Sequence, residues 1–249
     1  MKFLGRKRHS RSYSYHDYLL WNSYLKRYLP QTQNARVIEI GSAPGNFLVR
    51  AKQEFGLEPY GVELSYYGVE LNRRLFAQHN IKPENVIHAD FLDEKFQLDY
   101  EERFDVVVSR GFIEHFTDAK SIVEKHIKLL RKGGTLIISV PNYRGFYRIW
   151  EWLFDREHLL EHNLSIMKKS RFQDLFKSDR LLPLFCGYYG TFTFRLLGAK
   201  NRGVLKLPLY FCHHVMDPVV SLVLRLLFRY KGAESSIFSP NLLYVGIRI

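Results

Sequence analysis

Three acidic residues in the first half of the chain stand near the ends of short apolar stretches. Glu39 precedes a glycine at the end of the first stretch, and Glu63 and Asp90 come at the ends of the next two. A carboxylate at the position of Glu63 can accept hydrogen bonds from the two hydroxyls of a ribose. Asp90 can accept one from the exocyclic amine of adenine, while its neighbour Phe91 lines the ring. These residue types predict a nucleoside-binding site.

A loop of small residues, Gly41-Ser-Ala-Pro-Gly45, follows the first acid. The β-branched run before it and the apolar-periodic stretch after it predict a buried strand, a tight turn and a helix start. Such a loop lets the backbone approach a ligand closely and directs helix N–H groups toward it. A dinucleotide motif would need glycine where Ala43 and Asn46 stand, and a P-loop would need a Gly-Lys-Ser/Thr that is absent from the loop. The loop therefore fits neither a dinucleotide nor a nucleoside triphosphate.

Strands and helices must alternate to bring these residues together. The expected strands are 36–40, 59–63, 85–88, 104–108, 134–140, 184–194 and 241–249, and the helices between the first five include 46–55, 66–79 and 118–131. This pattern predicts an α/β fold with a doubly wound, mostly parallel seven-stranded sheet and helices on both faces. Ligands of such sheets bind beyond the carboxyl ends of the strands. The acids and the glycine loop stand at that edge.

Five segments in chain order resemble motifs of the class I S-adenosylmethionine-dependent methyltransferases, which have a Rossmann-like fold, and among them the enzymes that act on small molecules and saccharides. The resemblance covers about residues 34 to 141. Each segment is a weak signal alone, and the five together at strand ends are specific. They are VIEIGSAPGNF (37–47), YGVELS (60–65), HADFLD (88–93), FDVVVSRGFIEHF (104–116) and LLRKGGTLIISVPN (129–142).

The resemblance implies where S-adenosyl-L-methionine binds. The glycine loop would pass its methionine part, with Glu39 beneath it, and Glu63 would hold the ribose hydroxyls. Asp90 and Phe91 would frame adenine, and residues 109–111 would line the cofactor near the methyl group. The full predicted set is Glu39, Gly41, Ser42, Ala43, Gly45, Asn46, Phe47, Glu63, Leu64, Asp90, Phe91, Ser109, Arg110 and Gly111. The family often has glycine where Ala43 stands, which is a small departure.

The chain divides into three predicted parts. Residues 1–33 form a basic arm and an N-terminal lid helix, residues 34–141 the cofactor-binding core, and residues 142–249 the rest of the sheet with substrate-cap insertions at 142–180 and 195–239. The helix at 12–29 has two interpretations. It is a lid whose Tyr13, Tyr15 or His16 touches the ligand, or it is a helix packed on the sheet.

Methyl transfer from a sulfonium is a direct displacement, so the protein mainly aligns donor and acceptor and removes a proton from a hydroxyl acceptor. His115, just past the fourth strand, is the predicted general base, and shaping the cofactor pocket is its alternative role. His158 and His162 are secondary candidates. They stand four residues apart and could share a metal ion, but no third ligand is apparent, so no metal is predicted.

The acceptor should contact the aromatic insert after residue 142. Tyr147, Trp150 and His158 are the predicted substrate contacts, and ordinary packing within the cap is the alternative. Basic residues in the same region suit a phosphate- or carboxylate-bearing acceptor. They are Arg144, Arg148, Arg156, Lys168 and Lys169.

The net charge of +12 fits nucleic acid, an acidic membrane surface, an anionic substrate or a basic soluble protein with no such partner. Two cysteines without a Cys-x-x-Cys motif argue against structural zinc or a disulfide framework and suit a reducing cytoplasm. No stretch reaches the roughly 18 to 20 apolar residues of a membrane span. We therefore expect a cytoplasmic protein.

A late helix at 217–230 carries a narrow polar stripe on an apolar surface. Asp217, Ser221, Arg225 and Arg229 recur every four residues. The helix is buried against the domain or a second copy, or it lies at the inner face of a membrane beside its substrate. Both interpretations fit the pattern.

These features predict O-methylation of a small-molecule or saccharide acceptor, with a membrane-associated substrate as one form of it. An RNA methyltransferase is the alternative, because of the charge and because the Ser-Ala-Pro-Gly loop is similar to that of some RNA 2′-O-methyltransferases. Their catalytic Lys-Asp-Lys-Glu set cannot be placed here, since the fourth strand leads to Ser109 and Arg110. A third hypothesis is a non-catalytic protein that binds the cofactor. The presence of all three predicted acids argues against it. The acceptor atom and the oligomeric state do not follow from the sequence.

Overall fold

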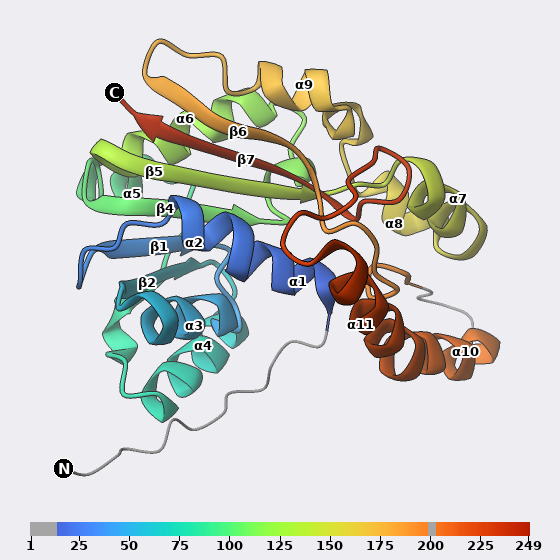
Figure 1. The fold of residues 1–249 in the computed structure, drawn as a ribbon. Helices are drawn as coiled ribbons and strands as arrows, with labels where there is room; N and C mark the ends of the chain where they lie inside the picture. The colour runs from blue at the N-terminus through green and yellow to red at the C-terminus, as the bar shows by residue number, and fades with distance from the viewer. Residues whose placement is uncertain (1–13, 199–202) are drawn as a thin grey trace.

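A computed structural model describes residues 14–198 and 203–249 (Figure 1). The basic arm at 1–11 and Tyr13 lie outside the described residues. The described part contains one seven-stranded sheet of order β3-β2-β1-β4-β5-β7-β6. Its strands are β1 (Arg36–Ile40), β2 (Glu58–Glu63), β3 (Val86–His88), β4 (Phe104–Arg110), β5 (Leu130–Pro141), β6 (Leu181–Tyr189) and β7 (Asn241–Arg248). Strands β1 to β5 are parallel, and β7 runs antiparallel to β5 and β6.

This architecture confirms the predicted α/β class and the mostly parallel seven-stranded sheet. Strand β1 lies between β2 and β4, and Ile38 pairs with Tyr60 on one side and Val107 on the other. Ile38 and Val107 are fully buried, because helices cover both faces of the sheet. Consecutive β-branched residues are what strands buried on both faces require. The predicted sixth strand differs most, since it begins at Leu181 and ends before Gly190, whose φ of +104° turns the chain.

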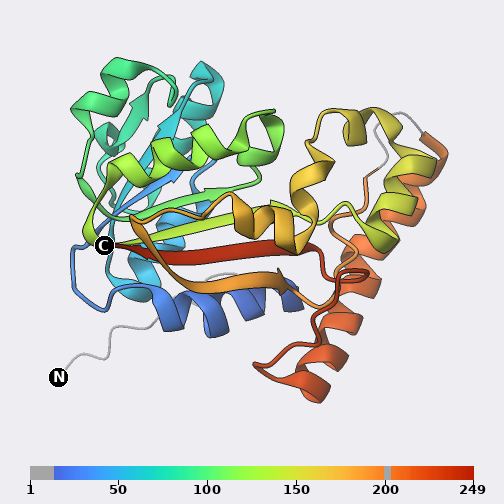
Figure 2. The same cartoon turned by 90° about the horizontal axis from the view of Figure 1, so that it is seen from above.

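Helices on the two faces bury separate apolar clusters. One face carries the N-terminal helix, made of α1 (Tyr15–Leu19), the π-helical η1 (Leu20–Leu25) and α2 (Lys26–Tyr28), with α3 (Asn46–Phe55) and α4 (Tyr66–Gln78). The other carries α5 (Glu94–Asp99), α6 (Ala119–Leu129), α7 (Gly145–Phe154), α8 (Arg156–Leu160) and α9 (Lys169–Asp174). Figure 2 shows the N-terminal helix and α6 on opposite sides of the sheet. Short 3₁₀ turns are η2 (Pro83–Asn85), η3 (Ile113–His115), η4 (Leu164–Met167) and η5 (Gly203–Leu205).

The N-terminal helix packs on the sheet, as one of its two interpretations required. Trp21 lies 5.1 Å from Phe47 of α3 between ring centroids, and Tyr24 lies 4.9 Å from Phe185 of β6. The hydroxyl of the buried Tyr15 donates to the Arg229 carbonyl at 2.9 Å. The start of this helix is therefore joined to the end of the late helix. The Tyr15 side chain contacts protein at that place.

The late helix is longer than the predicted 217–230. It consists of α10 (Lys206–Phe211), the π-helical η6 (Cys212–Met216) and α11 (Asp217–Phe228). The pair Asp217 and Pro218 is typical of a helix start. In the structure, however, the helix continues through both residues. Proline clashes with the carbonyl four residues before it in a regular α-helix, and the π-helical turn at that place relieves the crowding. Arg229, with φ of +51°, ends the helix.

One buried histidine of α6 gives a test of this packing. The side chain of His126 is fully buried, its Nδ1–H donates to the Ile122 carbonyl at 2.7 Å, and its ring packs 4.7 Å from Phe91. Burial lowers the pKa of His126 from 6.5 to about 4. Between these values the unfolded chain binds a proton that the folded chain does not, so stability falls as the pH drops. We expect the His126 contribution to the free energy of unfolding to fall by about 2 kcal/mol from near pH 7 to near pH 5.

Urea unfolding of the wild type and of His126→Phe at both pH values measures this contribution to the free energy of unfolding. The variant should lose less stability on acidification than the wild type does. Equal losses in the two proteins would show that His126 titrates normally in the folded state.

Candidate active site

The loop Gly41–Gly45 has a backbone that other residues would strain. Gly41 has φ of +67° and Gly45 has φ of +97°. A Cβ on Gly45 would lie 2.1 Å from Oδ1 of Asn72, and one on Gly41 would lie 3.3 Å from the Phe112 ring. The glycines therefore let the loop turn sharply from β1 into α3, whose first N–H groups face the edge of the sheet.

Strand β2 and helix α4 hold this loop in place. The N–H groups of Gly41 and Ser42 donate to the Val62 carbonyl at 3.0 and 3.2 Å. The buried Ser42 hydroxyl accepts a 2.7 Å hydrogen bond from Nδ2 of Asn72. The loop is thus preorganised by contacts of its own protein.

One predicted acid, Glu63, contacts the loop, and a second, Asp90, follows the strand beyond it. Glu63 accepts hydrogen bonds from the N–H of Ala43 at 3.3 Å and of Ser65 at 3.0 Å, and its side chain is half-buried. Asp90 follows the neighbouring strand β3, is exposed, and accepts from the Leu92 N–H at 2.8 Å. Each carboxylate has four acceptor sites, so both retain capacity for a ligand.

Phe91 does not line this edge as expected. Its side chain is 4% exposed, and its ring packs against Phe96, Phe112 and His126 in the core under α6. Burying a large aromatic ring in the core is more favourable in free energy than exposing it at a polar site. A face of Phe91 is therefore not free for adenine in this structure, whereas the neighbouring Leu64 is 65% exposed at the end of β2.

An ion pair between a buried acid and an exposed arginine joins β1 to the end of β4. Glu39 is 3% exposed, and its Oε1 accepts from Nε and Nη2 of Arg110 at 3.0 and 2.9 Å. The guanidinium of Arg110 also lies 4.7 Å from the Phe47 ring centroid. Burial raises the pKa of the Glu39 carboxyl, and the charge of Arg110 opposes this shift. The sequence predicted both residues as cofactor contacts but not this pairing.

Two buried oxygens at the same edge lack donors. Oε2 of Glu39 and Oγ of Ser109 have no hydrogen-bond partner among the residues that the structure describes. Buried polar atoms are normally satisfied, and an exception points to a missing ligand or water. A water or a polar ligand group that reaches them would supply the donors.

The predicted aromatic substrate contacts serve the cap instead. Tyr147 is fully buried, and its hydroxyl donates to the Thr193 carbonyl at 2.9 Å. Trp150 is partly buried and donates from Nε1 to the Gly198 carbonyl at 2.9 Å. Tyr147 cannot touch a substrate in this arrangement, because its whole surface is used in packing. The side chain of His158 is half-buried, with Nδ1 3.2 Å from the buried Glu151 carboxylate.

His115 lies in η3, just after the loop residue Gly111 with φ of +69°. It is exposed, its Nδ1–H donates to the Glu161 carbonyl at 3.3 Å, and its ring centroid lies 4.7 Å from that of His162. The sequence analysis missed the adjacent Glu114, which is 1% exposed. Burial raises the pKa of the Glu114 carboxyl to about 7. His162 lies close to Glu114 and His115 but comes from the cap. The spacing of residues in the sequence alone could not reveal that these side chains meet.

A basic cavity lies where β5 and β6 end. Its volume is about 440 Å³, and it is lined by Arg144, Lys168, Lys169, Ser170, Gln173, Tyr188 and Ser236. Three of the five cations predicted to hold an anionic acceptor come together here, while Arg148 and Arg156 are exposed elsewhere on the cap. Because these described lining residues include no acid, the cavity favours a phosphate or carboxylate.

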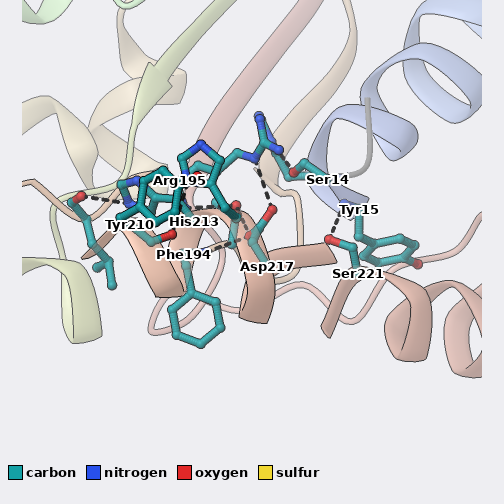
Figure 3. Close-up of polar contacts among 12 residues, drawn as sticks. Ser14, Tyr15, Phe194, Arg195, Tyr210, His213, Asp217 and Ser221 are labelled. Atoms are coloured by element: carbon teal, nitrogen blue, oxygen red, sulfur yellow. Dashed lines mark hydrogen bonds and ion pairs between the residues drawn. The ribbon is translucent and has the colours of Figure 1, made fainter. Parts of the chain in front are cut away.

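Asp217 and Ser221, the first two residues of the polar stripe of the late helix, face the protein (Figure 3), whereas Arg229 at its end is exposed. The buried Asp217 carboxylate accepts from the Thr193 hydroxyl at 2.7 Å, from the Phe194 N–H at 2.8 Å and from Nε of Arg195 at 3.1 Å. The buried Ser221 hydroxyl accepts from the Tyr15 N–H at 2.8 Å. The polar side is therefore the attachment side of this helix.

Large apolar side chains occupy its outer side. The leucines there include Leu207, Leu222, Leu226 and Leu227, which are 59–78% exposed. The segment Lys206–Phe228 is long and apolar enough to cross a membrane, and 11% of its apolar window is buried. This corrects the prediction that no stretch reaches that length. Core helices of soluble proteins pass the same criterion, but they are mostly buried and this one is not.

Comparison with known proteins shows the family of the chain. Residues 13–184 match the family described as "Methyltransferase domain". EEF1A lysine methyltransferase 2 of Danio rerio is 25% identical over 134 residues, which are 52% of this chain and 53% of that protein. The chain thus spans about half the length of this curated relative.

Solved structures resemble the whole fold. A geranyl diphosphate C-methyltransferase of Streptomyces coelicolor, in complex with Mg²⁺, geranyl diphosphate and S-adenosyl-L-homocysteine, has a TM-score of 0.61 at 16% identity, over 99% of this chain and 88% of that one. A chain from the complex between the Haloferax volcanii Trm112 methyltransferase activator and the putative methyltransferase has a TM-score of 0.58 at 18% identity, over 94% and 90%. At these identities the likeness shows the fold.

The residues at the sheet edge fit S-adenosyl-L-methionine. Oε2 of Glu39 and Oγ of Ser109 are acceptors without a described partner on β1 and β4, the strands that end beside the glycine loop. Glu63 and Asp90 keep acceptor capacity for ribose and adenine. The individual contacts in the predicted set, among them Asn46 and Gly111, remain predictions.

Replacing Glu63 should weaken cofactor binding. Hydrogen bonds to a charged group contribute about 1.5–3 kcal/mol, so we expect Glu63→Ala to lower the affinity for S-adenosylmethionine about 10- to 100-fold. Isothermal titration calorimetry measures this, with Glu84→Ala, an exposed acid in η2, as the matched control. Equal affinities in Glu63→Ala and the wild type would remove Glu63 from the site.

Proposed function

The chain belongs to the methyltransferase domain family and is an S-adenosylmethionine-dependent enzyme, and we propose that its acceptor is a small molecule or saccharide with an anionic group, methylated on a hydroxyl. The basic cavity is the observation that carries this proposal. Arg144, Lys168 and Lys169 converge on a volume of about 440 Å³, which suits a small charged molecule. Charge-assisted hydrogen bonds to phosphate or carboxylate are about twice as strong as neutral ones.

The position of the cavity supports the same assignment. Arg144 follows β5, and Tyr188 stands near the end of β6, which pairs with the start of β7 at Asn241. This is the edge at which the parallel strands β1 to β5 end, so cavity and cofactor loop share one side of the sheet. An anionic group held there would leave the rest of the acceptor free to extend toward the cofactor.

When bound, S-adenosylmethionine supplies the electrophilic methyl group, so the chain has to orient the acceptor, exclude water and hold a proton. His115 is the proposed proton acceptor for a hydroxyl, since it lies in the loop after β4 with an exposed ring. Its Nδ1–H donates to a carbonyl, which leaves Nε2 unprotonated and basic in the neutral ring.

We further propose that the enzyme works at the cytoplasmic face of a membrane, with the late helix as its contact. A helix that buries its polar stripe and exposes leucines is unfavourable in water and favourable in the apolar boundary of a bilayer. Asp217 is the only acid between residues 206 and 231, and its carboxylate is buried in a hydrogen-bonded cluster. The outer side of the helix is therefore free of the negative charges that anionic lipid would repel.

Attachment to the body favours a helix that lies along the membrane surface. Asp217 and Ser221 join it to the loop after β6 and to the N-terminal helix. Crossing the bilayer would carry these buried polar contacts into hydrocarbon, whereas a surface position leaves them intact. In Figure 1, α11 lies next to the start of α1, and α10 extends away from the sheet.

The net charge of +12 also supports RNA as the acceptor. RNA binding through phosphates would weaken steeply with salt. The exposed apolar surface of the late helix has no role in that alternative, so the small acceptor is our first choice.

Removing two cavity charges should reduce acceptor turnover without affecting the cofactor. We expect Lys168→Ala/Lys169→Ala to lower transfer of a labelled methyl group into an extract of the producing cells about tenfold or more, since two charge-assisted contacts are lost. The affinity for S-adenosylmethionine should stay unchanged. Lys120→Ala/Lys132→Ala, two exposed lysines away from the cavity, is the control. Equal transfer by both double variants would rule out the cavity as the acceptor site.

The membrane proposal predicts flotation with vesicles. Wild-type protein should float with vesicles that contain anionic lipid, and Leu222→Gln/Leu226→Gln should bind about tenfold or more weakly, because each leucine contributes about 1.5 kcal/mol or more on burial. Leu98→Gln/Leu182→Gln changes two leucines that are 58% and 50% exposed elsewhere and should float normally. A wild type that stays with the soluble fraction, or equal loss in both double variants, contradicts the proposal.

A further inference from the structure

Three groups that commonly bind metal ions meet beside the end of β4. Glu114 and His115 lie in η3, and His162 follows α8 in the cap. One ligand atom of each lies within 4.8 Å of the ligand atoms of the other two. Two imidazoles and one carboxylate are a donor set of catalytic zinc and of non-haem iron sites.

Both imidazoles are held in the tautomer that a metal requires. Nδ1 of His162 lies 2.6 Å from the His158 carbonyl, and Nδ1 of His115 lies 3.3 Å from the Glu161 carbonyl. A carbonyl oxygen only accepts, so each Nδ1 must carry the proton and each Nε2 must present its lone pair. Metal-binding histidines characteristically donate their other ring N–H to a backbone carbonyl or a carboxylate.

The carboxylate has a free oxygen at the same place. Glu114 is 1% exposed, and its Oε2 has no hydrogen-bond partner within 14–198 and 203–249. Leaving a buried carboxylate oxygen unsatisfied costs free energy unless a donor or a cation compensates it. In the tautomer that these carbonyl contacts set, Nε2 of His115 and of His162 carries no proton, so neither neutral ring can donate from it to the carboxylate. A cation between the three groups would compensate the carboxylate oxygen.

The surrounding chain fixes the distance between the two elements. The Asn163 N–H donates to the Glu114 carbonyl at 2.6 Å, and its Nδ2 donates to the Phe116 carbonyl at 3.1 Å. The Tyr143 ring packs edge-on against His162 at 5.1 Å between centroids. Since Asn163 follows His162 directly, these bonds hold the cap ligand against the turn that carries the other two.

We propose that Glu114, His115 and His162 bind a divalent transition-metal ion such as Zn²⁺. Ligand atoms around such an ion lie about 2.0–2.2 Å from it and so about 3–4 Å from one another, which side-chain rotations from the present spacing reach. Three protein ligands leave at least one position open, as in catalytic rather than structural sites.

The use of that open position rests on the proposed function. Placed just after Gly111, the ion would bind the acceptor hydroxyl and lower its pKa, so that the proton leaves to solvent. His115 would then promote methyl transfer as a metal ligand in place of a free base. Metal binding itself depends neither on the acceptor nor on S-adenosylmethionine, so the two proposals can fail separately.

Cobalt is the spectroscopic probe for this site. Tag-free full-length protein is titrated with Co²⁺ and its visible absorption recorded, and bound Zn²⁺ is counted by mass spectrometry after gel filtration. We expect one ion per chain in the wild type. His162→Ala and Glu114→Gln should bind on the order of 100-fold more weakly, since each removes a ligand. His214→Ala, which changes an exposed histidine of the late helix, should bind normally.

His115→Ala keeps the test decisive if Glu114→Gln unfolds, because the His115 side chain is exposed and its loss leaves the core unchanged. Weaker metal binding in His115→Ala and His162→Ala, with unchanged calorimetric affinity for S-adenosylmethionine, is the expected result. Absence of a stoichiometric ion in the wild type, or equal binding by wild type and both histidine variants, overturns the proposal whatever the acceptor proves to be.

Discussion

Parallel pairing of β1 with β2 on one side and β4 on the other is the constraint on which the site depends. Ile40 pairs with Val62 and with Ser109, so the next residues of all three strands emerge at one edge. Glu39 and Arg110, which are 71 residues apart in the chain, form a part-buried ion pair for this reason. The left-handed backbone at Gly41 and Gly45 then lets the chain turn sharply from β1 into α3 at this edge.

The second half of the chain brings acceptor chemistry to the same edge. Beyond β5 it builds a cap that supplies the basic cavity and His162, and then returns through antiparallel strands to the sheet. Asp217 anchors the late helix by its polar stripe, which leaves leucines outside. Such a surface is costly for a protein surrounded by water alone. In our proposal the methyl donor, the anionic acceptor and a membrane surface thus meet at one side of the fold.

Residues that act within one strand-turn-helix unit could be predicted from the sequence. The glycine loop, Glu63 and Asp90 follow the period of their own strands, and the sheet confirms that placement. Contacts across the fold could not be predicted in this way. Phe91 and Tyr147 are buried because distant helices cover them, and Glu114 meets His162 only because Asn163 joins the cap to η3. The sequence predicted the late helix and its polar stripe. Whether the polar or the apolar side of this helix faces water depends on distant partners such as Thr193.

The central claim is that this methyltransferase modifies a small anionic acceptor at a membrane. Transfer of a labelled methyl group from S-adenosylmethionine into an extract of the producing cells, separated into small-molecule, lipid, RNA and protein fractions, tests it directly. We expect label in the lipid or small-molecule fraction, on a compound that binds an anion exchanger. Label confined to RNA or to protein would contradict it.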